Sequence, residues 1–162
     1  MKVKATYLAV AVGIGIIALA VFYMYSADQG RIRGKTFGDS LQAIQDELKQ
    51  EQTLFYSKKE MLDEKSITQQ EFADFAKEHD AKLNEILAKY DSLRPPEPFV
   101  KSMELFKSST QKQIESDKYF VEWIASNDTS NKVRSDELIQ ESFEDEMAGL
   151  ASYNKAKNNA AG

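Results

Sequence analysis

The most apolar stretch of the chain lies near the N-terminus, runs from Ala5 to Tyr25 and contains no charged residue. It reads ATYLAVAVGIGIIALAVFYMY, 21 residues that as a helix would measure about 30 Å, close to the thickness of a bilayer's hydrocarbon core. Tyr7 lies near one end and Tyr23 near the other, where interfacial aromatic residues are common. We therefore expect one membrane-spanning anchor, preceded by a short basic tail over residues 1–4.

A cleaved signal peptide is the competing interpretation of this segment. Lys2 and Lys4 would form its basic region, and Ala18-Leu19-Ala20 would offer a small-residue cleavage site. Cleavage there would leave an apolar N-terminus, and the apolar run is long for an export signal, so we prefer a retained anchor. We expect the chain to be anchored in the cell membrane. The basic tip before the apolar run and the glycosylation triplet Asn127-Asp128-Thr129 favour placing the domain on the extracytoplasmic side.

Three small residues within the anchor, Ala11, Gly15 and Ala18, are spaced so that they share one helical face. Small residues in this pattern allow a second membrane helix to approach closely, although Ala and Gly are also common in membrane helices generally. We expect this face to contact a membrane-protein partner or a second copy of the chain.

The remainder of the chain shows helical spacing of apolar residues. Gly30, Gly34 and Gly38 predict a flexible juxtamembrane linker over residues 26–38, whose basic residues can contact headgroups or stay solvated. Apolar intervals of three and four then predict four helices: 39–65, one that starts with a capping box of Thr68 and Glu71, one that starts near Pro98, and one with its N-cap at Ser135.

These helices predict the fold class and the domain bounds. Because the connections are short, neighbouring helices should be antiparallel. We expect an all-α fold: a single N-terminal transmembrane helix, then an antiparallel four-helix bundle of two helical hairpins over residues 39–154, with a disordered tail over residues 155–162. The residues of the last helix expected to face inward are Ile139, Phe143, Met147, Leu150 and Tyr153.

Charge and cysteine content exclude several classes of function. After the anchor there are 19 basic and 26 acidic residues, and this acidic balance argues against binding of nucleic acid. The absence of cysteine excludes disulfides and thiolate metal sites. No phosphate-binding loop or nucleophile elbow is present, so we expect neither catalytic residues nor a cofactor.

One group of polar residues interrupts the apolar faces near the middle of the predicted bundle. Counting from the turns places the following residues at about one level: Glu51, His79, Thr110, Gln113, Asp117 and Glu146. Such a layer can be a buried hydrogen-bonded network, can rotate to the surface, or can bind a metal or small ligand through His79, Asp117, Glu146 and Glu51. Di-iron bundles need Glu-x-x-His on two helices, and Ala76 stands three residues before His79, so we favour the structural interpretations.

Aromatic residues also lie away from the predicted core of the third helix. Leu105, Tyr119 and the single tryptophan, Trp123, share a face that can bind a partner. The alternative is that Trp123 closes one end of the bundle.

The stretch from Leu83 to Tyr153 resembles a class of uncharacterised exported helical-bundle domains of bacteria and archaea. The matching residues are the turn Leu93-Arg94-Pro95-Pro96 and the following Phe99-Val100. This resemblance implies a membrane-anchored location and helical hairpins. It does not point to any particular activity. In architecture the chain is also similar to the one-span helical subunits of membrane enzyme complexes, such as the copper monooxygenases of ammonia-oxidising archaea.

Taken together, these features predict a non-catalytic, membrane-anchored, extracytoplasmic bundle that serves as an accessory or scaffold subunit, or as a partner-binding module, of a membrane complex. The alternative is a sensor or carrier that binds a small ligand or a metal in the central polar layer.

Overall fold

The computed structural model describes residues 32–159. This range contains four long helices and one short 3-10 turn, and no strand: α2 (Ile32–Asp63), α3 (Gln69–Ser92), η1 (Glu97–Phe99), α4 (Val100–Ser126) and α5 (Thr129–Asn159). The all-α prediction is confirmed. No helix within residues 32–159 is both long and apolar enough to cross a bilayer. The predicted anchor, with Ala11, Gly15 and Ala18, lies outside the described residues.

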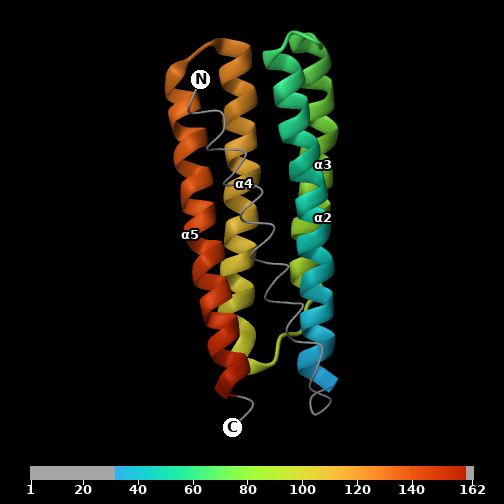
Figure 1. Cartoon of the computed structure of the whole chain (residues 1–162), viewed down its shortest axis with the longest axis vertical. Helices are drawn as coiled ribbons and strands as arrows, with labels where there is room; N and C mark the ends of the chain where they lie inside the picture. Colours follow the sequence, from blue (N-terminus) through green and yellow to red (C-terminus); the bar gives the residue numbers. More distant parts are fainter. Residues whose placement is uncertain (1–31, 160–162) are drawn as a thin grey trace.

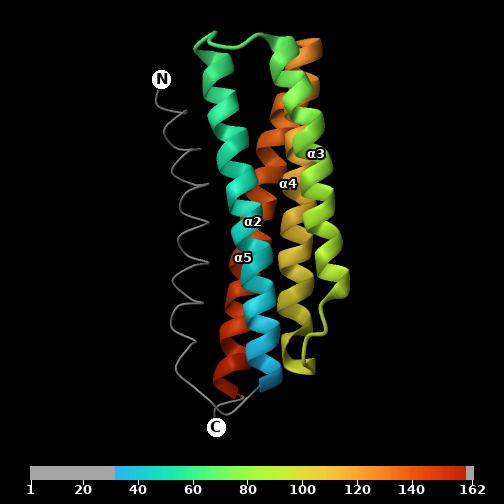
Figure 2. The same cartoon turned by 90° about the vertical axis from the view of Figure 1, so that its right-hand side faces the viewer.

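The four helices run alternately up and down and form a long bundle of two hairpins, α2–α3 beside α4–α5 (Figures 1 and 2). We call one end basal; it comprises residues 32–42, 89–104 and 150–159. The turns at 64–68 and 127–128 form the opposite, distal end. At the basal end the ring of Phe99 lies 5.7 Å from that of Phe37 and 5.0 Å from that of Tyr153, so all three segments meet there.

Helix α3 begins and ends where the sequence predicts. The Thr68 side chain accepts a hydrogen bond from the Glu71 backbone N–H at 3.1 Å, and the Glu71 carboxylate accepts from the Thr68 N–H at 2.7 Å. This reciprocal capping satisfies two backbone donors that the first turn leaves unpaired. The helix ends at Ser92, before the proline segment, and Pro98 lies in η1 rather than in the first turn of α4.

The structure corrects the linker predicted over residues 26–38, because α2 already begins at Ile32. Gly34 and Gly38 therefore lie inside a helix. Each glycine costs up to about 1 kcal/mol relative to alanine in such a position. Burial of Phe37 against Phe99 and Tyr153, which stabilises by roughly 2 kcal/mol, offsets this cost. Tertiary packing thus overrides the local preference of glycine.

The last helix is longer at both ends than predicted. It begins at Thr129, because the Asp128 carboxylate caps it by accepting a hydrogen bond from the Ser130 N–H at 2.9 Å. Asn127 adopts a left-handed conformation (φ 58°) and closes α4, so only two residues connect the helices. Ser135 is not an N-cap but a buried interior residue. Residues 155–159, predicted to be disordered, continue the helix.

The inward face of α5 also differs from the prediction. Met147 is 39% exposed, and Ile139 and Phe143 are only half-buried. The buried positions instead include small residues seven apart, facing similar residues on α4. We call this contact the serine seam: Ser102, Ser109 and Ser116 on α4, with Ser135, Ser142 and Gly149 on α5.

Hydrogen bonds and close contacts run along the serine seam. The Ser109 and Ser142 hydroxyls lie 2.9 Å apart, and the Ser116 hydroxyl donates to the Ser135 carbonyl at 2.8 Å. A Cβ on Gly149 would lie 3.3 Å from the Leu105 Cβ. Small side chains allow α4 and α5 to pack closely. The face of α5 that carries them is turned toward α4, in place of the face that carries its larger apolar residues.

Two apolar clusters fill the bundle, one toward each end. The basal cluster includes Leu41, Leu48, Leu83, Ile86, Phe106 and Ile114, and the distal cluster is built on Phe55, Phe72 and Phe120. Helices α2, α3 and α4 each contribute apolar residues to both clusters. Each of these helices also carries a buried polar residue between the two clusters: Gln52, His79 and Asp117, respectively. These three polar residues form the centre of the candidate site.

Candidate functional site

The layer between the apolar clusters is centred on Asp117 of α4. Its Oδ2 atom accepts a hydrogen bond from the Gln52 amide of α2 at 3.0 Å and lies 3.2 Å from the Nε2 atom of His79 on α3. His79 is only 2% exposed. One carboxylate therefore joins three helices. Because buried polar groups are costly when unpaired, these contacts fix the relative register of the helices.

The second ring nitrogen of His79 is less well satisfied. Its Nδ1 atom lies 3.6 Å from the Glu51 carboxylate, beyond hydrogen-bond distance, and is buried without a hydrogen-bond partner among the described residues. The Gln52 Oε1 atom is likewise buried without a hydrogen-bond partner among the described residues. The His79 ring stacks on Phe55 at a centroid distance of 4.6 Å, which fixes its orientation.

A second polar group lies nearer the basal end and is centred on Tyr90. Its hydroxyl accepts a hydrogen bond from the Gln45 amide at 2.6 Å and lies 3.0 Å from the Thr110 hydroxyl. Burial, together with the nearby Glu146 carboxylate, raises the pKa of the Tyr90 hydroxyl. Burial also raises the pKa of Glu146 from 4.5 to about 7, because desolvation penalises the charged carboxylate.

The structure places the predicted polar layer inside the bundle. His79, Thr110, Gln113, Asp117 and Glu146 are buried, and Glu51 is half-buried, so the interpretation in which these groups rotate to the surface is wrong. The layer is split, however. His79, Asp117 and Glu51 meet in the central layer, while Thr110 and Glu146 lie beside Tyr90 and Gln113 donates to Ser109 of the serine seam.

Sequence reasoning missed the polar residues of α2. Gln45 and Gln52 lie seven residues apart, in the same phase as the buried Leu41, Leu48 and Phe55. That spacing is a signal that their amides lie in the core, but it does not show which helix they face.

The layer does not assemble a metal centre of the kind considered from the sequence. Within residues 32–159, no three histidine or carboxylate side chains are arranged so that they could hold a metal ion. Of the four candidate ligands, Glu146 belongs to the second polar group, beside Tyr90. The described groups therefore support hydrogen bonding across the bundle.

A hollow of about 310 Å³ lies between α3 and α4 beside the central layer. Its exposed wall area is largely apolar, with Phe55, Ala76 and Val121 among the lining residues. Six ionisable residues also line it: Lys77, His79, Asp80, Asp117, Lys118 and Glu122. A hollow that combines apolar walls with polar groups can accept a small organic molecule.

The surface residues proposed from the sequence are half-buried rather than fully exposed. Trp123 packs edge-on against Phe120, with ring centroids 5.4 Å apart, and Lys132 of α5 lies 5.6 Å from its ring. Leu105 lies against the backbone of α5 at Gly149. Tyr119 is partly covered as well. Trp123 thus covers the distal end of the core, beside α5.

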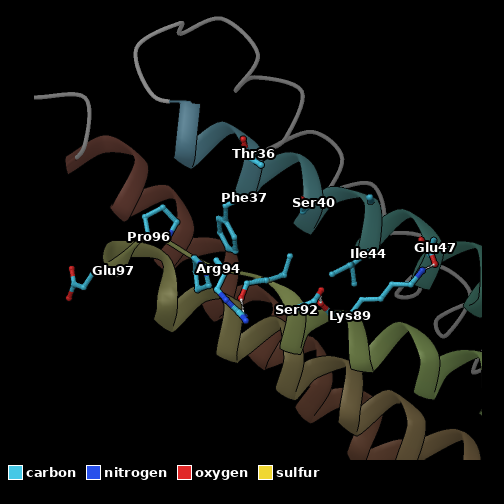
Figure 3. Close-up of a pocket in the computed structure, with 13 residues that line it drawn as sticks. Thr36, Phe37, Ser40, Ile44, Glu47, Lys89, Ser92, Arg94, Pro96 and Glu97 are labelled. Carbon is cyan, nitrogen blue, oxygen red and sulfur yellow. Dashed lines mark hydrogen bonds and ion pairs between the residues drawn. The ribbon is translucent and has the colours of Figure 1, made fainter.

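A larger groove of about 1010 Å³ opens at the basal end between α2 and the segment that follows α3 (Figure 3). Phe37 and Ile44 of α2 form one wall. Arg94 and Pro96 form the other, and the Arg94 guanidinium donates to the backbone carbonyls of Asp91 and Leu93. Apolar and cationic groups are therefore adjacent at this end of the bundle.

Comparison of the chain with protein-family models, with curated proteins and with solved structures finds no match. The site therefore has to be interpreted from its own geometry.

The central layer predicts a large effect of removing its shared acceptor. Asp117→Ala should destabilise the bundle by about 3 kcal/mol, because Gln52 and His79 would be left buried without their common partner. Denaturant unfolding of the full chain in mild detergent, followed by helical circular dichroism, measures the change. Glu115→Ala, an exposed position two residues away on α4, is the control and should shift stability by less than about 0.5 kcal/mol. Equal effects of the two substitutions would show that the layer is not stabilising.

Proposed function

We propose that this chain is a membrane-anchored, non-catalytic, extracytoplasmic helical bundle that acts as an accessory or scaffold subunit of a membrane complex. The observation that carries this proposal is the way its buried polar groups bond to one another. Asp117 joins Gln52 and His79, and Tyr90 joins Gln45 and Thr110, so most of the polar interior connects the helices. A network of this kind supports a stiff element of fixed shape.

The length of the bundle supports the same role. Helix α4 has 27 residues and so spans about 40 Å. A bundle of this length behind a 21-residue anchor segment would hold its distal end well clear of the bilayer. Partner contact through the membrane would use Ala11, Gly15 and Ala18.

Extraction from native membranes in mild detergent, followed by native sizing and mass spectrometry, tests this role. We expect the chain to migrate with a defined partner or as an oligomer. Gly15→Leu should release the partner, because a large side chain on the small-residue face keeps a second helix at a distance. Gly13→Leu, on the opposite side of the same predicted helix, is the matched control and should leave the complex intact. Migration of the unmodified chain alone would contradict the proposal.

A second candidate function is a sensor or carrier for a small ligand. It is favoured by the hollow beside His79 and by the Nδ1 atom of that ring, which is buried without a hydrogen-bond partner among residues 32–159. Elemental analysis and native mass spectrometry of protein purified without chelators test it. A bound species present in stoichiometric amount and lost on His79→Ala would support this candidate. If each protein shows only the mass of its own unliganded chain, and neither contains metal, this candidate is excluded.

A further inference from the structure

Charge is distributed unevenly along the bundle. The basal end, residues 32–42, 89–104 and 150–159, carries seven Lys and Arg residues against four Asp and Glu residues. The rest of the described bundle, residues 43–88 and 105–149, carries 11 basic and 21 acidic residues. The basal end also holds two helix N-termini and two C-termini, so the helix dipoles largely cancel and the side chains determine its sign. The basal end is therefore cationic on an otherwise acidic bundle.

Several of the basal cations lack an anionic partner. Lys35, Arg94, Lys101 and Lys155 are exposed and form no ion pair with any described residue. By contrast, Lys89 pairs with Glu47. Unpaired cations gathered at one end of an acidic domain are available to an external anionic surface.

Apolar groups are exposed beside these cations. Val100 is 37% exposed, Pro98 is exposed, and the groove between Phe37 and Pro96 opens at the same end (Figure 3). Adjacent cationic and apolar side chains suit the interfacial region of a bilayer, where phosphate groups and the upper acyl chains meet.

We propose that the basal end docks on the anionic phospholipid headgroups of the membrane that holds the anchor, so that the bundle stands end-on and its acidic part points away from the bilayer. This inference rests on the anchor of the proposed function. Only residues 26–31 separate the predicted anchor from the start of α2, and six residues reach at most about 20 Å. The tether keeps the basal cations close to the headgroups, and the membrane repels the acidic remainder.

The single tryptophan provides an intrinsic probe of this orientation. Trp123 lies near the distal end, 23 residues along α4 from Val100, which corresponds to about 35 Å. A bundle lying flat would bring Trp123 within about 20 Å of the surface, roughly the width of two helices. Energy transfer from Trp123 to a dansyl-labelled lipid headgroup falls steeply with distance and separates the two orientations.

The full chain is reconstituted into nanodiscs of phosphatidylcholine alone or with phosphatidylglycerol. We expect low transfer from Trp123 in the anionic discs and higher transfer in the neutral discs. Substituting Arg94→Glu, Lys101→Glu and Lys155→Glu together should raise transfer in the anionic discs, and so should high salt on the unmodified chain. The control, Lys77→Glu, Lys82→Glu and Lys118→Glu, makes the same charge change at exposed positions away from the basal end and should leave transfer low.

The possible outcomes distinguish a failure of end-on docking from a failure of the proposed membrane anchor. Equal transfer in both disc types, unchanged by the basal substitutions and by salt, would overturn end-on docking while leaving the anchor intact. A chain that does not co-purify with discs of either composition would overturn the anchor and the docking together. Helical circular dichroism of each variant verifies that changes in transfer do not reflect unfolding.

Discussion

Glu146→Gln is expected to stabilise the bundle by up to about 3 kcal/mol at pH near 8 and by almost nothing at pH near 4. Burial raises the pKa of the folded carboxyl to about 7 from an ordinary 4.5, so the unfolded chain loses this proton first as pH rises. Stability therefore falls between about pH 4.5 and about pH 7 and is flat above that range. An amide of the same shape carries no charge, so it avoids this cost.

Denaturant unfolding of both proteins across this pH range, in the same detergent, measures the difference. Glu115→Gln, an exposed carboxyl on α4, provides the control and should leave the pH dependence unchanged. A Glu146→Gln effect that is constant with pH would mean that the carboxylate is solvated or paired in the folded chain.

Gly149→Leu should destabilise the bundle by about 3 kcal/mol or more, because the serine seam has no room for a large side chain. A Cβ at this position would already lie 3.3 Å from the Leu105 Cβ and 3.4 Å from the Ser102 carbonyl. The added atoms of leucine would have to separate α4 from α5 or displace Leu105.

Two further substitutions sharpen this test. Gly149→Ala should be close to neutral, since the gain in helix propensity of about 1 kcal/mol offsets a tight contact. Ala148→Leu adds the same leucine at an exposed neighbouring position and should change stability by less than about 0.5 kcal/mol. If Gly149→Leu unfolds at the same denaturant concentration as Ala148→Leu, the two helices are not closely packed.

Much of the fold could be predicted because local signals agreed with the tertiary structure. The capping box at Thr68 and the proline segment mark the bounds of α3, and the helical spacing of apolar residues identified the four helices. The errors arose where tertiary contacts outweigh local preference. Burial of Phe37 keeps α2 helical through Gly38, and Asp128 caps α5, which begins at Thr129, six residues before Ser135.

The predicted inward face of α5 was right at Leu150 and Tyr153, which are buried, but wrong over residues 139–147 for a different reason. Large apolar residues such as Ile139, Phe143 and Met147 suggest one face, whereas the structure buries Ser135, Ser142 and Gly149. A pattern of apolar residues does not identify buried serine and glycine, although the spacing of seven between these residues is visible in the sequence. Close helix contact stabilises by packing and hydrogen bonding rather than by the area of any one side chain.

The candidate site was predicted in part. Counting residues from the turns placed His79, Asp117 and Glu51 at one level, and they do meet. It could not separate them from Glu146, because residue counting carries an uncertainty of about one turn. Nor could it find Gln52, whose role depends on which face of α2 is directed at α4.

An even number of antiparallel helices returns the chain to its starting end, so the start of α2 and the end of α5 lie at the same end of the bundle, while the two-residue turn at Asn127 and Asp128 lies at the other end (Figure 1). This has a practical consequence for labelling. A fluorophore or epitope attached after residue 159 would sit beside the basal cations and disturb any contact made there. One inserted between Asn127 and Asp128 would stand at the opposite pole, where it can report height and accessibility without touching that contact.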